Sequence, residues 1–272
     1  MKLKVYLSGE IHTNWRDEII DKCKSKNLEI EFSSPTTNHE LSDDVGVKIL
    51  GDEEKKFWHD NKGAKINAIR TRNSIEKADI VIDFTSPKAL FNFTEAAVSF
   101  NTGLVIGTTG LDESHFNLLK QTSNSTKVFY APNMSYGVNT FFEIARKAAK
   151  HLKDFDIEII ETHHRHKKDA PSGTALKLGE EIVAELGLSK SNFNFKRQDQ
   201  EDQRKENEIG FSSIRGGNIP GEHTVIFHGD NESVELTHKA YNRKIFSDGA
   251  IEAAVWLSSK EKGFYTFKDM IS

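Results

Sequence analysis

The first half of the chain alternates short apolar runs with segments of helical periodicity, and this alternation restricts the possible folds more than any other feature. Residues 3–9 (LKVYLSG) form an apolar run that ends in Gly9, and residues 15–27 follow with a helical pattern. Strands that alternate with crossover helices form a parallel sheet that is covered on both faces. The sequence therefore predicts an α/β fold built on a parallel sheet.

The same rhythm continues as far as residue 133. Further strands are predicted at 28–35, 78–87, 104–110 and 126–133, and further helices at 64–78, 90–103 and 113–124. Ligands of such sheets bind beyond the carboxyl ends of the strands. Phe84 with Thr85, residues 107–110 (GTTG) and residues 131–133 (APN) all follow predicted strands. We therefore expect these loops to lie together at the binding edge.

The rhythm changes after Asn133, which predicts a second domain. Its expected elements are a helix at 139–155, a strand at 157–166, a helix at 172–187 and antiparallel strands at 209–217, 222–229 and 233–241. The glycine at position 187 is a typical helix stop. Residues 193–208 are polar and charged, and we interpret them as a mobile loop, with a lid over a site as the alternative. The second domain is thus expected to be α+β with a mixed or antiparallel sheet.

The domain boundaries follow from the last helix. Residues 249–260 are amphipathic, so we expect them to pack back on the first domain. This predicts a first domain of residues 1–134 that is completed by 245–272, and a second domain of residues 135–244.

Composition excludes several classes of partner. The chain of 272 residues has a formal net charge of −4, so nothing in its overall charge indicates nucleic acid. No apolar run approaches the ~18 residues of a membrane-spanning helix, and the N-terminus is a predicted strand and not a signal peptide. The one cysteine, Cys23, fits a reducing compartment and is interpreted as a buried structural thiol. We expect a cytoplasmic protein.

The segment 161–175 reads ETHHRHKKDAPSGTA and is the most unusual stretch of the chain. Three histidines, one arginine and two lysines fill six consecutive positions before a turn of small residues. Such a run is either a solvated basic edge or a site that holds an anion and gives it a proton. If residues 157–166 are extended, His163, Arg165 and Lys167 share one face of the strand and the other two histidines take the opposite face.

The small residues that follow favour an anion site. Ser172, Gly173 and Thr174 are predicted to begin a helix, and the first peptide N–H groups of a helix are unpaired and carry partial positive charge. Gly173 allows a ligand to approach this backbone closely. A cationic strand end beside an open helix start suits a carboxylate or a phosphate.

Two other chemistries are weaker interpretations of the same residues. The HHRH run lacks the i,i+4 pair of a helical zinc site, and an extended strand would put neighbouring imidazoles on opposite faces. A serine hydrolase would need a G-x-S-x-G turn between a strand and a helix, and the chain has none. We therefore expect no metal site and no serine nucleophile.

Long motifs run in order from about residue 78 to the C-terminus. They are DFTSP, VIGTTG, APNMSYGVN, HHRHKKDAPSGTA, IGFSSIRGGNIPGEHTVIF and LTHKAYNRKIFSDGAIEAAVWL. This set resembles the dihydrodipicolinate reductase family, also called the 4-hydroxy-tetrahydrodipicolinate reductase family, of lysine and diaminopimelate biosynthesis. The resemblance implies a Rossmann-like first domain, and the NAD(P)H-dependent reduction of 4-hydroxy-tetrahydrodipicolinate to tetrahydrodipicolinate.

The resemblance also implies roles for the histidine-rich segment. His163 matches the proton donor of the family, and Lys167 matches its second catalytic residue. An imidazole suits proton transfer because its pKa lies near the working pH, while the lysine would hold the substrate and stabilise negative charge. The matching substrate contacts are His164, Ser172, Gly173 and Thr174.

The cofactor implied by the resemblance is NADPH or NADH. The matching cofactor-binding residues are Phe84, Gly107, Thr108, Thr109, Ala131, Pro132, Asn133, Met134 and Arg243. The first domain is then nucleotide-binding, and the second binds a small dicarboxylate substrate and carries the assembly surface of a homotetramer. No nucleic-acid or membrane partner and no metal are expected.

Residues 1–77 depart from this pattern. The family should open with a strand and a glycine-rich turn of the type G-x-x-G-R-M-G that cradles pyrophosphate. Here LSGEIHTNWRDE follows the first strand, with Gly9 as its only glycine and Glu10 directly after it. Residues 1–77 instead resemble the YtoQ family, whose fold looks like that of nucleoside deoxyribosyltransferases. The chain is therefore interpreted as a hybrid whose two parts meet near EKADIVI.

The hybrid character leaves alternative functions open. The YtoQ-like part favours a nucleoside- or nucleotide-binding protein, or a deoxyribosyltransferase-like enzyme, as the alternative to a reductase. Its polar and aromatic candidates are Glu10, His12, Asp43, Asp44, Trp58, His59 and Asp60, none of which is assigned a catalytic role. A third possibility is an inactive protein that keeps the assembly surface of the reductases.

Overall fold

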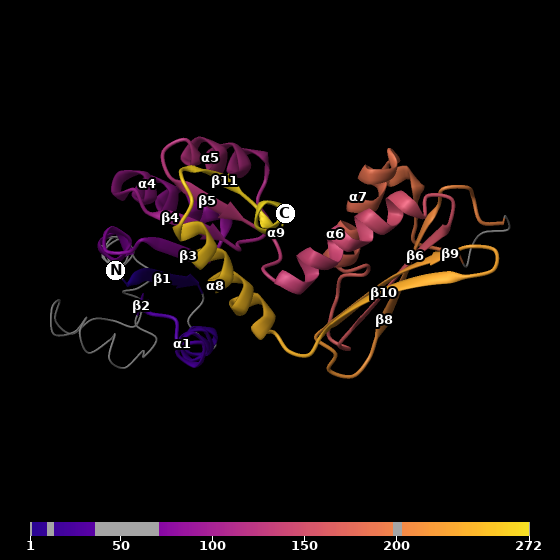
Figure 1. The fold of residues 1–272 in the computed structure, drawn as a ribbon, viewed down its shortest axis with the longest axis horizontal. Coiled ribbons are helices and arrows are strands. Elements are labelled where there is room, and N and C mark those ends of the chain that lie inside the picture. Colours follow the sequence, from indigo (N-terminus) through magenta and orange to yellow (C-terminus); the bar gives the residue numbers. More distant parts are fainter. Residues whose placement is uncertain (1, 10–13, 36–70, 198–202, 272) are drawn as a thin grey trace, which may run out of the picture. The chain divides into compact units, whose positions relative to one another are not determined.

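The computed structural model describes residues 2–9, 14–35, 71–197 and 203–271 (Figure 1). The chain divides into two compact units. The first unit contains residues 1–134 and 247–272, and the second contains residues 135–246. Within the described residues, no helix is both long enough and apolar enough to cross a membrane.

The first unit is built on a six-stranded sheet. Its strands are β1 (Leu3–Gly9), β2 (Ile30–Ser33), β3 (Ile80–Phe84), β4 (Gly103–Ile106), β5 (Lys127–Tyr130) and β11 (Gly263–Tyr265). The order is β11-β5-β4-β3-β1-β2, and every pairing is parallel. The chain order reverses between β1 and β3, as at the switch point of a Rossmann-like sheet. The predicted α/β fold with a parallel sheet is confirmed.

Helices cover both faces of this sheet. They are α1 (Trp15–Ser25), α4 (Leu90–Phe100), α5 (Glu113–Ser123), α8 (Lys244–Ser258) and the short α9 (Phe267–Ile271), with residues 71–76 also helical and a 3-10 turn, η2, at Pro87–Ala89. One face of the sheet packs against α4, α5 and the helical residues 71–76 in a single apolar cluster. The middle strands β3 and β4 are buried on both faces and are therefore apolar, with Asp83 of β3 as the exception.

Helix α8 joins α1 in this unit although the two helices are far apart in the sequence. Lys22 of α1 forms an ion pair with Asp248 of α8, and Lys26 pairs with Glu252 at 3.3 Å. Cys23 lies between these lysines in the sequence and is buried, as expected of a structural thiol. Burial raises the pKa of its thiol, which disfavours the reactive thiolate.

The second unit places two long helices against a five-stranded sheet. Its helices are α6 (Tyr136–His151), α7 (Gly173–Leu186) and the 3-10 turn η3 (Lys190–Asn192), and its strands are β6 (Asp156–His163), β7 (Phe193–Asn194), β8 (Ile209–Arg215), β9 (Gly221–His228) and β10 (Ser233–Ala240). The strand order is β10-β9-β6-β8-β7. Helix α7 ends where predicted, because Gly187 adopts a left-handed conformation with φ of 67°.

The predicted antiparallel run of three strands is partly wrong. Strands β9 and β10 are antiparallel, and so are β6 and β9, but β8 pairs with β6 and runs parallel to it. The reason is that α7 carries the chain across the sheet between β6 and β8, which is the connection that a parallel pair requires. The sheet is therefore mixed, which the prediction of a mixed or antiparallel sheet allowed.

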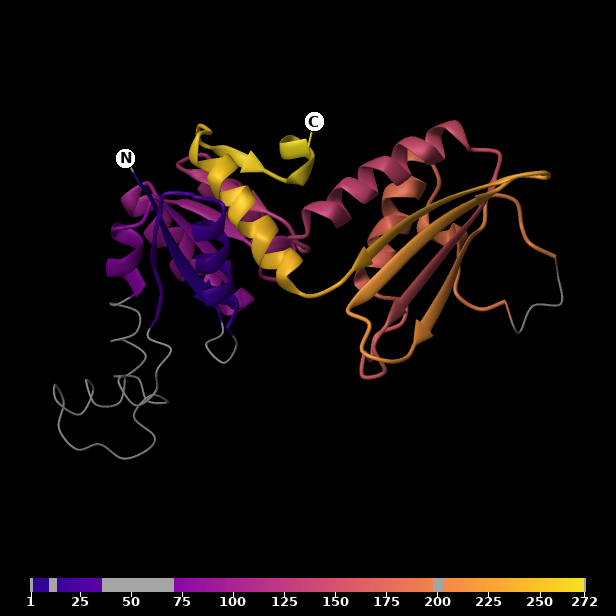
Figure 2. The same cartoon turned by 60° about the horizontal axis from the view of Figure 1, so that its bottom comes forward.

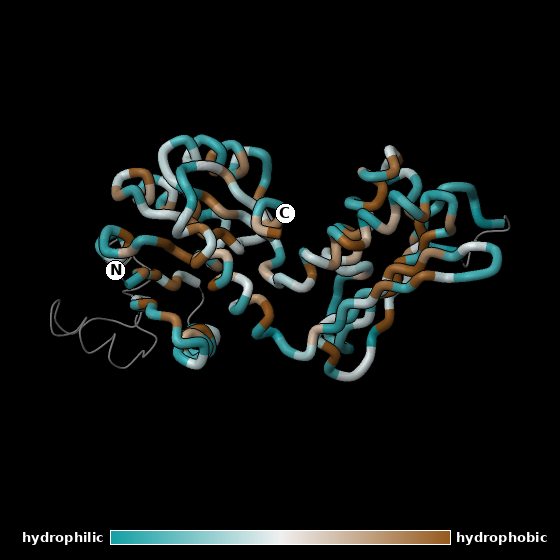
Figure 3. Tube along the Cα trace, in the orientation of Figure 1, coloured by the Kyte–Doolittle hydropathy of each residue, from teal (hydrophilic) through white to brown (hydrophobic). Residues whose placement is uncertain are grey.

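Only one face of this mixed sheet carries helices of the unit (Figure 2). Alternate side chains of β6 and β9 are buried against α6 and α7, including Ile159, Val225 and Phe227. In Figure 3 hydrophobic stretches run along the strands of both sheets. On the opposite face, no helix among the described residues of this unit covers the sheet, and Ile214 remains 51% exposed.

The segment interpreted as a mobile loop contains some ordered structure. Phe193 and Asn194 form β7, which the prediction missed because a two-residue strand carries no periodicity. Arg197 and Arg204 flank residues 198–202, which lie outside the described part of the chain. Both arginines form ion pairs with Glu158 of β6 and Glu208. The alternative of a lid over a site stays untested.

The carboxyl ends of β3 and β4 meet through a tight contact. A Cβ atom added to Gly107 would lie 2.2 Å from Cε1 of the Phe84 ring. The ring of Phe84 also contacts Trp15 edge-on, with ring centroids 5.6 Å apart. Glycine is therefore needed at position 107 to let the aromatic ring cover the backbone.

We expect Gly107→Ala to lower the free energy of unfolding by about 1 to 3 kcal/mol, since the new methyl group would overlap the Phe84 ring. Urea denaturation of the full chain measures this loss. In the Phe84→Leu background the same substitution should cost less than about 1 kcal/mol. Gly216→Ala is the control, because a Cβ there would meet no atom within 4 Å. Equal losses at the two glycines would contradict the proposed overlap.

Candidate functional site

The end of β6 places two polar side chains on the buried face of the second sheet. Glu161 and His163 alternate with outward-facing residues, and they are only 1% and 7% exposed. The predicted extension of the strand to residue 166 is wrong. Strand β6 ends at His163, and a turn follows in which the Lys167 N–H donates to the His164 carbonyl at 3.1 Å.

This turn is held by the loop between β8 and β9. The His164 N–H donates to the Ile219 carbonyl at 2.8 Å, and the Gly216 N–H donates to the His163 carbonyl at 3.0 Å. The predicted sharing of one strand face by His163, Arg165 and Lys167 is therefore also wrong, since only His163 belongs to the strand. Arg165 and Lys167 belong to the turn that follows the strand.

Glu161 is the centre of a buried hydrogen-bond network. Its Oε2 atom lies 2.6 Å from His163 Nδ1 and accepts a hydrogen bond from Arg215 Nη1 at 2.8 Å. Its Oε1 atom accepts from Arg215 Nη2 at 2.7 Å and from the Ser172 N–H at 3.2 Å. One carboxylate thus joins β6, the end of β8 and the start of α7.

The electrostatics of this network follow from burial and from charged neighbours. Burial opposes ionisation of Glu161, but hydrogen bonds from Arg215 and His163 outweigh it and lower the pKa of the carboxyl to about 2. Desolvation lowers the pKa of His163, which the Glu161 carboxylate partly offsets, and the positive charges of Lys167 and Arg215 lower it further. Without an added anion, the neutral form of His163 is therefore favoured near pH 7.

Helix α7 begins beside this network, as predicted. Ser172 is its N-cap, and the Ser172 hydroxyl oxygen accepts a hydrogen bond from the Ala175 N–H at 3.2 Å. A Cβ at Gly173 would meet no atom within 4 Å, so the helix start is open at that position. The N-terminal N–H groups and the dipole of such a helix attract an anion.

A second buried histidine supports the helix start. His223 of β9 is 4% exposed, and its Nε2 atom lies 2.9 Å from the Ser172 hydroxyl oxygen. Its ring meets that of His163 edge-on, with centroids 5.1 Å apart. Burial, followed by the charge of His163, lowers the pKa of His223 to about 3, so this imidazole is neutral near pH 7.

The remaining predicted site residues, His164 and Lys167, lie in the turn after β6. Lys167 Nζ lies 2.8 Å from Asp169, and its side chain is 21% exposed. His164 Nδ1 is buried and has no hydrogen-bond partner among the described residues. A buried polar nitrogen without a partner is costly, so a ligand group that reaches His164 would be stabilising.

Glu161, Arg215 and His223 were missed as site residues by the sequence analysis. Glu161 precedes His163 by two positions, and strand alternation alone would have placed it on the same face. Arg215 and His223 stand roughly fifty or more positions away from it, and only the strand pairing brings them to β6. Among the described residues, no group of three or more His, Cys, Asp or Glu is arranged to hold a metal ion.

The predicted cofactor loops lie at the carboxyl edge of the first sheet. Thr108 is buried, and its hydroxyl donates to Asp83 Oδ2 at 2.7 Å. Asp83 is fully buried and accepts further hydrogen bonds from the hydroxyl of Thr85 at 2.6 Å and from its N–H at 3.2 Å. Burial raises the pKa of this carboxyl. Asp83 thus ties the loop after β3 to the loop after β4.

The other predicted cofactor residues differ in exposure. Ala131 and Met134 are buried, whereas Thr109 and Pro132 are exposed and Asn133 is half-buried. Arg243 is exposed and belongs to the second unit. The structure therefore brings together Phe84, Gly107 and Thr108, and the assignment of all these residues to a cofactor remains a prediction.

The start of α1 is where a Rossmann-like domain would hold a pyrophosphate. A Cβ at Gly9 would lie 3.0 Å from the Trp15 ring, so this ring occupies the space beside the strand end. Arg16 is 3% exposed and donates to the carbonyl oxygens of Leu7 and Gly9 at 3.3 and 2.8 Å. The Arg16 guanidinium is thus hydrogen-bonded to the backbone of β1.

Two further features of this helix start disfavour a phosphate. Asp17 and Glu18 place negative charge in the first turn of α1. A half-buried tryptophan and two acidic residues do not form the glycine-lined approach that a pyrophosphate needs. The described residues at this position therefore do not fit the phosphate part of a dinucleotide. Residues 10–13, with Glu10 and His12, lie outside the described chain, as do Asp43, Asp44, Trp58, His59 and Asp60.

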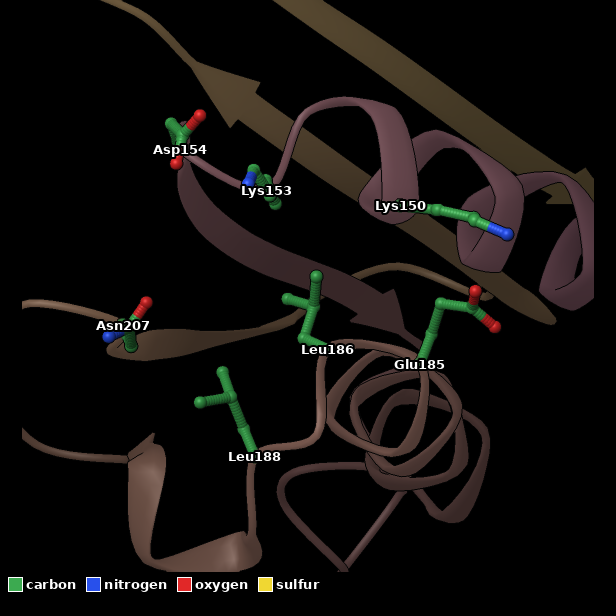
Figure 4. Close-up of a pocket in the computed structure, with 7 residues that line it drawn as sticks. All are labelled: Lys150, Lys153, Asp154, Glu185, Leu186, Leu188 and Asn207. Carbon is green, nitrogen blue, oxygen red and sulfur yellow. The ribbon is translucent and has the colours of Figure 1, made fainter.

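A hollow of about 310 Å³ lies elsewhere in the second unit (Figure 4). It is lined by Lys150, Lys153, Asp154, Glu185, Leu186, Leu188 and Asn207. Lys153 and Asp154 precede β6, and Glu185 and Leu186 are the last residues of α7, so the hollow lies at the opposite end of both elements from His163 and Ser172. It contains none of the predicted substrate residues.

Comparison with known families divides the chain at the boundary between the units. Residues 137–271 match the family model described as dihydrodipicolinate reductase, C-terminus. Residues 6–134 match the model described as nucleoside 2-deoxyribosyltransferase YtoQ. Both predicted resemblances are confirmed, and the YtoQ match extends beyond the expected junction near residue 78.

Individual relatives support one family for the whole chain. A 4-hydroxy-tetrahydrodipicolinate reductase from Rickettsia bellii is 44% identical over 210 residues, which cover 76% of this chain and 82% of the relative. The enzyme of that name from Aquifex aeolicus is 41% identical and covers 100% of this chain and 99% of its own length. A dipicolinate-bound dihydrodipicolinate reductase from a Paenisporosarcina species has the same fold, with a TM-score of 0.67, 23% identity and full coverage of both chains. The chain therefore belongs to the 4-hydroxy-tetrahydrodipicolinate reductase family.

Proposed function

We propose that this protein reduces 4-hydroxy-tetrahydrodipicolinate to tetrahydrodipicolinate, in lysine and diaminopimelate biosynthesis, with NADH or NADPH as the hydride donor. The observation that carries the proposal is the position of His163, which is buried on the Glu161 carboxylate and followed in the chain by the open start of α7. A ring with two carboxylates needs positive partners, and a hydride addition needs a proton. This segment offers both.

His163 is the proposed proton donor. Its Nδ1 atom is occupied by Glu161 at 2.6 Å, so Nε2 is the nitrogen that can give a proton to the substrate. An incoming dianion favours the charged imidazolium and thus raises the pKa of His163 when the substrate is present. Lys167, whose side chain is partly exposed, supplies a further positive charge that stabilises the reacting anion.

The proposed carboxylate contacts are the start of α7 and the turn after β6. Gly173 and Thr174 follow the N-cap Ser172, so their peptide N–H groups point out of the helix start. The Ser172 hydroxyl is hydrogen-bonded to the Ala175 N–H and to His223, and these bonds hold the N-cap in place. His164, whose buried Nδ1 atom has no hydrogen-bond partner among the described residues, is a further proposed contact.

The proposed cofactor sites are the loops after β3, β4 and β5. Phe84, Gly107–Thr109 and Ala131–Met134 would contact the nicotinamide side of the dinucleotide, with Arg243 as an additional contact. The cofactor would supply the hydride when bound. The described residues at the start of α1 do not fit its pyrophosphate.

Assembly and location belong to the same proposal. The face of the second sheet that carries no helix of its unit is the proposed surface of a homotetramer, and the exposed Ile214 lies on β8 of that sheet. A cytoplasmic location without membrane or nucleic-acid partners agrees with the charge and cysteine content of the chain.

We expect His163→Gln and Lys167→Ala each to lower kcat by ~10²-fold or more, because a lost general acid or a lost charge partner removes stabilisation of the transition state. Steady-state kinetics with the full chain measures this. Arg165→Ala is a matched control, since Arg165 is an exposed cation in the same turn. Wild-type turnover in both His163→Gln and Lys167→Ala would remove the proposed mechanism.

Binding of pyridine-2,6-dicarboxylate should take up protons near pH 7. His163 has a lowered pKa in the free protein, so it is mainly neutral at this pH and becomes charged when the dianion arrives. Affinity should therefore fall as the pH rises from about 6 to 8 and also as salt increases. Calorimetric titration in buffers of different ionisation enthalpy measures the uptake.

The control for this titration is His163→Gln, which should bind the dicarboxylate without the pH-dependent uptake. Identical uptake in the variant would assign the proton to another group. Absence of binding at low salt, in a folded sample, would count against the substrate site as a whole.

NADH and NADPH should bind weakly, at roughly millimolar Kd, because Asp17 and Glu18 place negative charge in the first turn of the helix that should accept the pyrophosphate. Lost N–H contacts to a charged group cost ~1.5–3 kcal/mol each, and ~3 kcal/mol weakens binding more than a hundredfold. Titration with both cofactors and with nucleosides measures this. Replacing residues 1–77 with a glycine-loop N-terminus from a reductase should restore tight cofactor binding.

Micromolar affinity of the unmodified chain for NADH or NADPH would show that its own N-terminal half is a working cofactor site. Tight binding of a nucleoside would favour the alternative function instead, which the match of residues 6–134 to the YtoQ family supports.

A further inference from the structure

Glu161 contacts three groups that must be arranged together at the proposed site. Its two carboxylate oxygens accept from Arg215, lie against His163 Nδ1 and accept from the Ser172 N–H, at distances between 2.6 and 3.2 Å. With 1% exposure, the carboxylate has no access to bulk water. Its acceptor positions are therefore filled by protein donors.

The contact with His163 determines which ring nitrogen carries a proton. An ionised carboxylate only accepts hydrogen bonds, so Nδ1 of His163 must hold a proton and Nε2 is left to exchange one with a ligand. The ring is confined on two more sides. His223 meets the ring edge-on, with ring centroids 5.1 Å apart. The backbone of Gly221 is also close to the ring, since a Cβ atom added to Gly221 would lie 3.0 Å from Nε2 of His163.

Arg215 controls the charge of the same carboxylate. Its two-pronged contact holds the pKa of Glu161 low, so the carboxyl stays ionised over the whole working pH range. It also offsets part of the negative charge that Glu161 presents to His163. The Glu161 carboxylate raises the pKa of His163 and the Arg215 charge lowers it. The two effects oppose each other, so the imidazole can both accept and release a proton.

The contact with Ser172 couples the imidazole to the helix start. The Ser172 N–H donates to Oε1 of Glu161, while Oε2 of the same carboxylate holds His163. A shift of this carboxylate would therefore move the proton donor and the N-cap of α7 together. His223 also contacts both groups, through the Ser172 hydroxyl and through the ring of His163, whereas Glu161 hydrogen-bonds to both of them.

We propose that Glu161 is a positioning residue of the reductase, which fixes the orientation and the protonated nitrogen of His163 while it anchors the start of α7. This inference rests on the proposed role of His163 as proton donor. Glu161 itself touches neither substrate nor cofactor and acts only through its partners.

The first test is the pH dependence of kcat in Glu161→Gln. Loss of the carboxylate removes the contribution that raises the pKa of His163, so the fall in kcat at high pH should move to lower pH and kcat at pH 7 should fall at least tenfold. Glu143→Gln is the matched control, because Glu143 is an ion-paired carboxylate of α6 bound to Arg146. It should leave the profile unchanged. An unshifted profile in Glu161→Gln would overturn the proposal.

The second test separates positioning from simple charge pairing. Glu161→Gln alone leaves the half-buried Arg215 without its carboxylate partner, and an unpaired charge at such a position can destabilise a protein. We therefore compare Arg215→Gln with the double variant Glu161→Gln/Arg215→Gln, in which neither charge remains. The double variant should have a kcat at least tenfold below that of Arg215→Gln. Equal kcat values would show that Glu161 serves only to neutralise Arg215.

A third readout needs neither cofactor nor turnover. In protein labelled with [13Cε1]histidine, the His163 resonance is identified by its absence in His163→Gln, and its titration gives the pKa of the ring. The pKa should be lower in Glu161→Gln than in the native protein. An unchanged titration would overturn the positioning role, whereas an inactive native protein with a shifted titration would refute only the proposed function.

Discussion

The contact between the Glu161 carboxylate and the Arg215 guanidinium is the interaction on which the second unit depends. Burying the Glu161 carboxylate is costly, and the cost is offset only when a positive partner and further hydrogen bonds fill its acceptor positions. Here His163 and the Ser172 N–H form the remaining hydrogen bonds to the Glu161 carboxylate. The pair therefore joins the ends of two parallel strands to the start of the helix that connects them. The same contact that stabilises the βαβ unit also leaves an imidazole beside an open helix start, so the stability of this edge and its chemistry have one origin.

The first unit uses a buried acid differently. Asp83 accepts hydrogen bonds only from uncharged groups, namely Thr85 and the hydroxyl of Thr108, among the contacts that the structure describes for it. Without a cationic partner, burial dominates and raises its pKa, whereas the arginine beside Glu161 lowers the pKa of that carboxyl. Asp83 can thus shape the loops after β3 and β4, but it offers a ligand no fixed charge. The polar groups around Asp83 in the first unit are uncharged, whereas those around Glu161 in the second unit include the charged Arg215.

The sequence predicted most elements because their signals are local. The apolar runs of β3 and β4, the N-cap Ser172 and the left-handed Gly187 are each set by residues within a few positions. The position of β8 was not predictable in this way, since its parallel pairing with β6 depends on the course of α7. For the same reason the local histidine cluster was noticed and predicted to be an anion site, while its partners Arg215 and His223 were missed. The strand was also extended too far, because the hydrogen bonds that end it at His163 come from residues 216–219.

The division of the chain between two family matches coincides with a physical division. The YtoQ match ends at residue 134, the reductase match begins at residue 137, and the compact units separate between residues 134 and 135. Residues 135–246 contain the hydrogen-bond partners that the structure describes for Glu161, His163, Ser172 and His223. The proposed proton donor and anion site therefore need nothing from the strands of the first unit to keep their geometry. Among the described residues, no hydrogen bond of Glu161, His163 or Ser172 crosses this boundary, so we expect a change in the first 77 residues to leave the geometry of the proposed substrate site intact.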